Sequence, residues 1–393
     1  MILYFSIYLS DISREKEHMK IGFDAKRAAQ NRTGLGNYSR FVLQLLMDCV
    51  PENDYVLYVP DPEKCSFLSA LKGKFMLRFP DTCFWKRFCS LWRVWGMTRN
   101  IEKDGIDLYH GLSNELPLTI RKAKQTKSIV TIHDLIFLRH PSCYPVIDRL
   151  IYNYKFRRAC RNADRIIAVS ECTKRDIVSL YHVDPGKIDV VYQSCDKRFK
   201  HVVPEEEKQA VKEKYALPDK FVLSVGSIEK RKNLMLLAKA ICSLDESYKV
   251  VAVGKYTPYA GKVKKFLKRQ GQEHRLLMIH NVPFKELPAF YQLATTFVYP
   301  SFYEGFGIPL LEALNSGVPV IGAHGSCLEE SGGPFSLYVP PTDAKALAKA
   351  IERTYSDSVL RENMIREGKK YAEKFEPEYL AGRLLEVYHK TLK

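Results

Sequence analysis

The sequence predicts an α/β protein built from two doubly wound domains, each with a parallel sheet covered by helices. Its 393 residues suffice for two domains of ordinary size, and 46% hydrophobic with 27% charged residues is typical of a soluble globular protein. Short apolar runs with strand character alternate with amphipathic helical patterns. This alternation begins twice, near Lys20 and again near Phe221, which predicts two sheets.

The expected strands form two series. Those of the first half are 20–25, 55–59, 75–79, 106–110, 128–132, 165–169 and 188–192. Those of the second half are 221–226, 249–254, 276–280, 295–300, 318–323 and 337–339. The charged segment 201–214 is expected to link the halves and to run into a helix, so the predicted domains are 19–200 and 201–374.

Residues 1–18 differ from the rest of the chain. Residues 1–10 are apolar and aromatic but lack a basic leader and a small-residue cleavage site, which argues against a secretory signal. The segment that begins at Met19 has the pattern of a first strand. We therefore expect either that Met19 is the true start or that 1–18 is an appendage outside the fold.

The chain is strongly basic, with a formal net charge of +16. Such a charge suits an anionic substrate, an acidic membrane surface or nucleic acid. Because the sequence contains no nucleic-acid-binding motif, we favour the first two partners. The ten cysteines form no C-x-x-C pair, which is typical of reduced thiols in a cytoplasmic protein, and no apolar run reaches the ~18 residues that span a bilayer.

A glycine-bearing turn follows the first strand. Gly34 and Gly36 stand at the start of a helix whose apolar residues recur at helical spacing. A strand, a glycine loop and a helix N-terminus in this order favour phosphate binding. An ordinary tight turn is the alternative, and the G-x-G pattern alone does not decide between them.

Two histidines stand where strands of the first half end. His110 and His133 are expected at the carboxyl edge of the sheet, where doubly wound folds bind ligands. A lone histidine is more often structural, and we expect this for His110. His133 is followed by Asp134 and is the better candidate for a functional role.

Two helical segments of the first half combine aromatic and basic residues. The segment 84–99 either faces the core with a solvated basic side or contacts a membrane. Its apolar stripe consists of Phe84, Phe88, Leu91, Trp92 and Trp95. The segment 149–161 is expected to present a solvated basic face.

The loop after the first strand of the second half is a candidate diphosphate site. Gly226 and Ser227 are followed by the adjacent cations Lys230, Arg231 and Lys232. Charge-assisted hydrogen bonds from such cations are worth roughly 1.5–3 kcal/mol each when shielded from water. A solvated basic turn is the alternative.

The most informative stretch is 295–331, a strand, a loop and a helix followed by another strand. The loop carries Glu304 and the run Gly305, Phe306 and Gly307, and the helix begins near Ile308 and Pro309. Free amides at a helix N-terminus bind anions, whereas carboxylates such as Glu304 and Glu312 are better suited to hydroxyl groups. A ligand that carries both phosphate and hydroxyl groups is a sugar nucleotide. The alternative is that the two glutamates are solvated residues on an ordinary helix.

Glu304 and Glu312, spaced as E-G-F-G-I-P-L-L-E, resemble the paired-glutamate motif of retaining glycosyltransferase family 4. The resemblance implies the GT-B architecture, two facing Rossmann-like domains with a cleft between them. It implies that Glu304 faces the donor sugar, that Glu312 faces the nucleotide ribose, and that Lys232 binds phosphate. Ser227 departs from the arginine that many members carry, so either Arg231 supplies the second positive charge or Lys232 works with less help.

The same resemblance extends to other parts of the chain. It implies that the loop of Gly34 and Gly36 approaches the donor diphosphate and the acceptor, and that His133 contacts the donor sugar or the acceptor. The segment 325–333 is similar to the family's glycine-serine loop and the glutamate turn after it. The closing helix in 375–393 is expected to pack back on the first domain.

The predicted function is a retaining, metal-independent glycosyltransferase of cell-surface polysaccharide synthesis, mannosyltransferase-like by resemblance. No cofactor is expected; the donor is a GDP- or UDP-linked sugar, and the acceptor is a saccharide or a lipid-linked saccharide. No carboxylate pair has the DxD form in a context suited to magnesium, so Lys232, Arg231 and the amides of Gly307 and Ile308 are expected to stabilise the leaving diphosphate. The expected location is the cytoplasm, with peripheral contact at an acidic inner membrane face.

Three alternatives remain at this point. A sugar-nucleotide epimerase on the same scaffold would convert the donor without an acceptor, because a fold does not fix a reaction. A non-catalytic nucleotide-sugar-binding protein would bind the donor without transfer. A nucleic-acid-binding protein would show a steep salt dependence of affinity.

Overall fold

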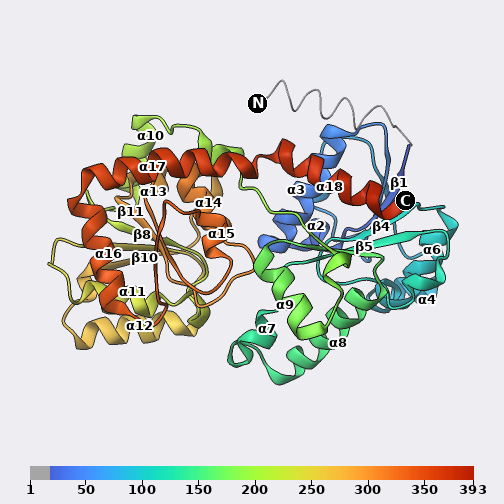
Figure 1. Cartoon of the computed structure of the whole chain (residues 1–393), viewed down its shortest axis with the longest axis horizontal. Helices are drawn as coiled ribbons and strands as arrows, with labels where there is room; N and C mark the ends of the chain where they lie inside the picture. The colour runs from blue at the N-terminus through green and yellow to red at the C-terminus, as the bar shows by residue number, and fades with distance from the viewer. Residues whose placement is uncertain (1–17) are drawn as a thin grey trace. The chain divides into compact units, whose positions relative to one another are not determined.

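The computed structural model describes residues 18–393 and divides the chain into two compact units (Figure 1). The first unit contains the chain up to Gln193 together with Glu376–Lys393, and the second contains Ser194–Phe375. Residues 194–200, predicted to belong to the first domain, thus lie with the second unit. The expectation about residues 1–18 and the start at Met19 concerns a segment of which 1–17 lie outside the described residues.

Within the described residues, the first unit holds a seven-stranded parallel sheet in the order β3-β2-β1-β4-β5-β6-β7. The strands lie close to the predicted ranges. Their bounds are β1 (Lys20–Asp24), β2 (Asp54–Tyr58), β3 (Met76–Arg78), β4 (Leu108–Gly111), β5 (Lys127–Ile132), β6 (Arg165–Ala168) and β7 (Ile188–Val190).

Helices cover both faces of this sheet, because successive strand residues point to opposite sides and both sides are apolar. In β2, for example, Leu57 joins the core beneath α2, α3 and α18, whereas Val56 joins the core beneath α6, α8 and α9. The helices are α2 (Lys26–Gln30), α3 (Gly34–Cys49), α4 (Cys83–Arg87), α5 (Cys89–Leu91), α6 (Met97–Lys103), α7 (Ile136–Arg139), α8 (Val146–Asn162), α9 (Glu171–Tyr181) and α18 (Pro377–Leu392).

The segment 84–99 is not one core-facing helix, as one of the two interpretations had it. It is divided into α4, α5, the π-helical turn η2 (Trp92–Gly96) and the start of α6. Only Trp92 of its apolar stripe is buried, and its indole nitrogen donates to Asn100 at 2.9 Å. The extra residue of a π turn shifts the helical register, so the rest of the stripe points away from the core.

The second unit holds, in its described part, a six-stranded parallel sheet in the order β10-β9-β8-β11-β12-β13. Connections run outward in both directions from the pair β8 and β11, so this pair is the topological switch point of the sheet. The strands are β8 (Val222–Val225), β9 (Val250–Val253), β10 (Leu276–Ile279), β11 (Thr296–Tyr299), β12 (Val320–Ala323) and β13 (Leu337–Val339).

Helices α11, α12 and α16 share one core with the second sheet, and α14 packs against β11, β12 and α17. The segment predicted as a linker contains α10, which packs on α13 within this unit. The helices are α10 (Glu205–Lys214), α11 (Leu234–Ile241), α12 (Pro258–Arg269), α13 (Leu287–Leu293), α14 (Ile308–Asn315), α15 (Leu328–Gly332), α16 (Ala344–Ser356) and α17 (Ser358–Ala372). Across residues 18–393, every helix is too short or too polar to cross a membrane.

Candidate active site

The candidate site lies at the carboxyl ends of β8 and β11. The loop after β8 carries Gly226 and Ser227 and continues through the 3-10 turn η7 (Lys230–Lys232) into α11. The loop after β11 carries Glu304 and ends at the N-terminus of α14. Because β8 and β11 are paired neighbours at the switch point, the two loops lie side by side, where parallel α/β sheets bind their ligands.

Glu304 joins two cations from the neighbouring loop. Its Oε1 accepts from Lys232 Nζ at 2.7 Å, and its Oε2 lies 2.7 Å from Arg231 Nη1. Ser301 Oγ donates to Oε1 at 2.6 Å. We call Arg231, Lys232 and Glu304 the cation–carboxylate cluster. Since Glu304 is only 8% exposed, it is not a solvated glutamate, and its charge is neutralised inside the protein.

The cluster fixes the charge of its carboxylate. Burial alone would raise the pKa of Glu304, but the ammonium of Lys232 and the guanidinium of Arg231 outweigh it and lower the pKa to about 2. Burial lowers the pKa of Lys232, and the nearby Arg231 adds to this, although Glu304 opposes both. Glu304 is therefore ionised at neutral pH and can only accept hydrogen bonds.

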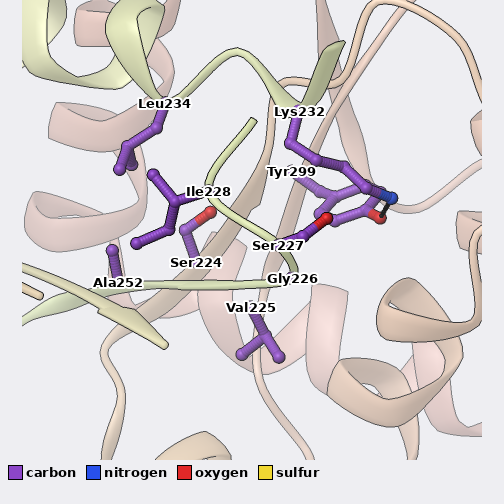
Figure 2. A pocket seen from close by; sticks show the side chains of 9 residues that line it. All are labelled: Ser224, Val225, Gly226, Ser227, Ile228, Lys232, Leu234, Ala252 and Tyr299. Carbon is purple, nitrogen blue, oxygen red and sulfur yellow. Dashed lines mark hydrogen bonds between the residues drawn. The ribbon is translucent and has the colours of Figure 1, made fainter. Parts of the chain in front are cut away.

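Tyr299, at the end of β11, holds Lys232 from the other side. The ammonium donates to the Tyr299 hydroxyl and lies 4.9 Å from the centre of its ring. Figure 2 shows Lys232 and Tyr299 meeting beside the loop of Gly226 and Ser227, and all four residues line one small pocket. Lys232 thus points toward the backbone that a phosphate would approach.

Arg231 is bound more tightly within the protein than a solvated basic turn would allow. It also donates from Nη1 to the Tyr303 carbonyl at 2.9 Å and from Nη2 to Glu229 at 2.9 Å. Burial lowers its pKa, but the Glu304 carboxylate outweighs this and raises the pKa above its usual value. Of the three adjacent cations, only Lys230 is exposed.

Helix α14 begins where the loop that carries Glu304 ends. Gly307 caps the helix with φ 102°, a conformation that favours glycine, and a Cβ there would lie 2.7 Å from Leu328 and 2.8 Å from Ser331. Pro309 has no N–H, and the Leu310 amide donates to the Gly307 carbonyl at 3.0 Å. Among residues 18–393, the amides of Gly307 and Ile308 donate to no acceptor, so both are available to an anion.

Glu312 is one turn further along α14 and has different surroundings. It is 8% exposed, and its Oε2 accepts from the hydroxyl of Tyr291 at 2.7 Å. Burial raises the pKa of Glu312 to about 7, and the bond from Tyr291 opposes the rise. Unlike Glu304, it has no cation partner in the described chain, so it is readily protonated near neutral pH.

The remaining predicted residues of this loop divide between site and core. Gly305 is half-buried. Phe306 is buried, and its ring packs 5.6 Å from that of Phe375, centre to centre. In the similar glycine-serine loop, the Ser326 hydroxyl is buried and finds no partner in the described part of the chain. Ser326 is therefore a further candidate donor to a ligand.

Contrary to expectation, Gly34 and Gly36 do not lie in a loop directly after the first strand; α2 intervenes, and both glycines lie in the first turn of α3. A Cβ on Gly34 would meet no atom within 4 Å, so this position is open. A Cβ on Gly36 would lie 1.9 Å from the Asn31 carbonyl oxygen. Gly36 is thus required by the packing of α3 against the turn before it, which supports the interpretation as a tight turn at that position.

The two histidines of the first unit are both buried and neutral. Burial lowers the pKa of His110 to about 3, and its ring nitrogens contact Tyr388 of α18 at 2.7 Å and Thr131 at 2.8 Å, which is the structural role expected. Burial lowers the pKa of His133 to about 4. Its Nε2 lies 2.9 Å from the Leu112 carbonyl, so Nε2 carries the proton and Nδ1 remains an acceptor.

Three residues of this site were not identified from the sequence. They are Tyr299, Ser301 and Tyr291. Tyr299 resembled an ordinary strand residue, and only its place at the strand's carboxyl end distinguished it. For metal ions, the part of the chain from residue 18 onward holds no group of three or more His, Cys, Asp or Glu side chains arranged as ligands.

Two family models match the chain. "Glycosyl transferases group 1" matches residues 205–371, and "Glycosyltransferase Family 4" matches residues 54–198. Each match falls largely within one of the two units. Between them the two models cover most of the chain.

Curated relatives and solved structures agree with these matches. The chain is 29% identical over 290 residues to O-antigen chain mannosyltransferase B of Escherichia coli, covering 72% of this chain and 74% of that protein. It is 29% identical over 223 residues to O-antigen chain mannosyltransferase RfbU of Salmonella typhimurium, covering 57% and 59%. Anabaena HepE, solved in complex with UDP and glucose, matches 95% of this chain and 100% of its own with a TM-score of 0.73 at 16% identity, and so shares the fold.

Proposed function

Since the chain belongs to the group 1 glycosyltransferases, we propose that it moves a sugar from a nucleoside-diphosphate sugar to a saccharide acceptor in polysaccharide synthesis. The observation that carries the proposal is the cation–carboxylate cluster at the switch point of the second sheet. A diphosphate fits the cations and the α14 amides, and a sugar ring fits an ionised carboxylate.

The transfer step follows from the charges of the site. The bond between the anomeric carbon and the β-phosphate oxygen breaks, and the electron pair stays on the phosphate. The acceptor hydroxyl forms the new bond to carbon on the same face, and its proton passes to the departing phosphate oxygen, so the configuration is retained. Lys232 stabilises the charge that grows on the phosphate, which is where a preorganised donor lowers the barrier most.

Glu304 holds the donor sugar in this scheme. Because its pKa is lowered to about 2, it accepts hydrogen bonds from sugar hydroxyls and donates none. A diphosphate that shares Lys232 and Arg231 weakens their bonds to Glu304, and the freed oxygen lone pairs then bind hydroxyls. The sugar and the diphosphate therefore support each other's binding.

We propose that the reaction is independent of metal ions. Lys232, Arg231 and the amides of Gly307 and Ile308 together supply the positive potential that a divalent ion supplies in other sugar-nucleotide enzymes. The test compares transfer in excess EDTA with transfer in excess Mg²⁺. Equal rates support the proposal, and loss of transfer in EDTA contradicts it.

Three further residues have proposed roles in ligand binding. Glu312 accepts hydrogen bonds from ribose hydroxyls in place of the one that it now accepts from the Tyr291 hydroxyl. His133 positions the donor sugar or the acceptor through its unprotonated Nδ1. Gly34 allows close approach of a ligand, because the space beside it is open.

The donor and acceptor are proposed from the relatives. Two relatives are O-antigen mannosyltransferases by name, which favours mannose from GDP, with a UDP-linked sugar as the second choice. The acceptor is a saccharide or a lipid-linked saccharide at the cytoplasmic face of a membrane. The net charge of +16 agrees with peripheral contact with acidic lipid.

The experiment begins with a thermal-shift panel of nucleotides and nucleotide sugars, because a ligand of the folded state raises the unfolding temperature. The nucleotide sugar that shifts it most is then incubated with saccharide acceptors, and the anomeric configuration of the product is read by NMR. A retained configuration supports the proposal. Conversion of the donor without an acceptor indicates an epimerase, and binding without any transfer indicates a nucleotide-sugar-binding protein.

A further inference from the structure

Helix α8 in the first unit leaves a row of large apolar side chains in solvent. These side chains are 45–71% exposed, and they are Val146, Ile147, Leu150, Ile151 and Tyr154. Soluble surfaces rarely gather so many large apolar groups in fewer than three helical turns. The row was not found from the sequence, which predicted only a solvated basic face for this helix.

The side chains of the row lie along one face of α8. Ile147, Leu150, Ile151 and Tyr154 recur at helical spacing, and Arg157, Arg158 and Arg161 continue the same exposed face. The opposite face is buried in the core of the first unit through Phe156, Ala159 and Cys160. Helix α8 is therefore firmly docked, and its outward face is apolar in its first half and basic in its second half.

A second exposed row lies in the segment 84–95. Its members recur at i, i+4, i+7 and i+11, are 40–56% exposed, and are Phe84, Phe88, Leu91 and Trp95. The exposed cations Lys86, Arg87 and Arg99 accompany them. The two segments that carry these rows are linked, behind the rows, through Glu115, which binds the buried Arg93 of η2 at 2.7 Å and Lys155 of α8 at 3.3 Å.

We propose that these two rows and their cations form a docking face for a bilayer rich in anionic lipid. Apolar and aromatic side chains enter the boundary between headgroups and acyl chains, and arginines beside them bind lipid phosphates. The charge of the face decides between occupants. A symmetric contact with a second copy would bring the same arginines against one another, whereas anionic lipid is complementary to them.

The face also gives the proposed enzyme a way to reach an acceptor that is anchored in lipid. The inference rests on the proposed function only for this purpose, because its test measures lipid binding and not sugar transfer. The two can therefore fail separately.

The test is flotation of the whole chain with vesicles of phosphatidylcholine, with and without roughly 30% phosphatidylglycerol. We expect binding to the anionic vesicles that is at least about tenfold stronger than to neutral ones and that weakens as salt is raised. The variant Ile147→Ser/Leu150→Ser/Ile151→Ser and the variant Arg157→Gln/Arg158→Gln/Arg161→Gln should each lose about tenfold in binding. Val359→Ser, which removes an exposed apolar side chain of the second unit, is the matched control and should bind as the parent does.

Two further measurements keep the outcome decisive. All substituted side chains are exposed, so the unfolding temperature and its shift by GDP or UDP should match those of the parent, which shows that the fold and the nucleotide site persist. Parent-like flotation of both triple variants overturns the proposal, as does absence of flotation by the parent at low salt. Sedimentation showing a dimer that the Ile147→Ser/Leu150→Ser/Ile151→Ser variant abolishes, without vesicle binding, also overturns it in favour of a second copy.

Discussion

The first strand of each unit is followed by a glycine-bearing segment, and the two segments use glycine for different purposes. In the first unit, Gly36 lies in the first turn of α3 and is enclosed, with the Asn31 carbonyl where a side chain would lie. After β8, Gly226 has φ 144° and lies beside Lys232 at the edge of a pocket. The first glycine permits the protein to pack against itself, and the second leaves backbone open to a ligand.

The side chains at the strand ends also differ between the two units. The loop after β8 supplies Arg231 and Lys232. These two cations bind the buried carboxylate of Glu304 at the switch point and keep it ionised. The histidines at strand ends in the first unit are neutral and bonded within the protein. The two sets of side chains therefore differ in charge: Glu304 of the second unit is ionised, whereas the two histidines at strand ends of the first unit are neutral.

The largest expected effect is a fall in kcat when the ammonium group of Lys232 is removed. Lys232→Ala should lower kcat by roughly 10²–10³-fold, because removal of one preorganised donor to a developing charge costs about that much. The rate of nucleoside diphosphate release during transfer measures it, with the donor chosen by thermal shift. Lys230→Ala, which removes the exposed neighbouring cation, is the control and should retain most activity. Parent-like kcat for Lys232→Ala would refute the assignment of electrostatic catalysis to this loop.

The next effect concerns folding of the first unit. Gly36→Ala should destabilise it by about 3 kcal/mol or more, because the new Cβ would overlap the Asn31 carbonyl and only a backbone shift relieves it. Gly34→Ala meets no atom within 4 Å and should leave the free energy of unfolding almost unchanged. Denaturant titration measures both. If Gly34→Ala keeps its stability but loses transfer, then a ligand approaches this loop and the contrast between the units is weaker than stated.

The sequence predicted the fold closely because strand periodicity and turn residues are local signals. The observed strands coincide with the expected runs within a few residues, and β13 (Leu337–Val339) matches in full. The helical segment 84–99 was predicted less well, because a π turn between Leu91 and Met97 is not visible in apolar spacing. The exposed row on α8 was missed because the basic residues of 149–161 indicated a solvated face, and because Val146 and Ile147 precede that segment.

The candidate site was predictable in its charged residues and not in their partners. Lys232, Glu304 and Glu312 are identified by chemistry and spacing along the chain. Their pairing depends on which strands are neighbours, so the bonds of Tyr299 to Lys232 and of Tyr291 to Glu312 require the sheet order. The roles of the site residues in binding and catalysis stay predictions.

A smaller effect is expected for Tyr299, a positioning residue that acts through Lys232. Tyr299→Phe keeps the ring and removes the hydroxyl that Lys232 donates to, which should lower kcat about tenfold, the value of one hydrogen bond of ~1–1.5 kcal/mol. KM for the donor should change less, because the lysine remains present but less fixed. Tyr256→Phe, which removes a hydroxyl bonded to the Met278 carbonyl in the same unit, is the control. A fall in stability with unchanged kcat would show that Tyr299 only supports the core.

The smallest effect is a pH dependence of stability that the second unit should carry through Glu312. Its pKa in the folded protein is raised to about 7, above the ordinary value of a glutamate, so folding favours the protonated form. The stabilisation is therefore present at low pH and is lost as the pH rises through about 7. Between about pH 6 and pH 8 the parent should lose about 1 kcal/mol more than Glu312→Gln, which cannot ionise but keeps an acceptor for Tyr291. Urea titrations of both proteins at the two pH values measure the difference. Equal losses would show that Glu312 titrates as an ordinary glutamate, and the contrast between a buried carboxylate held ionised by cations and one left without them would then fail.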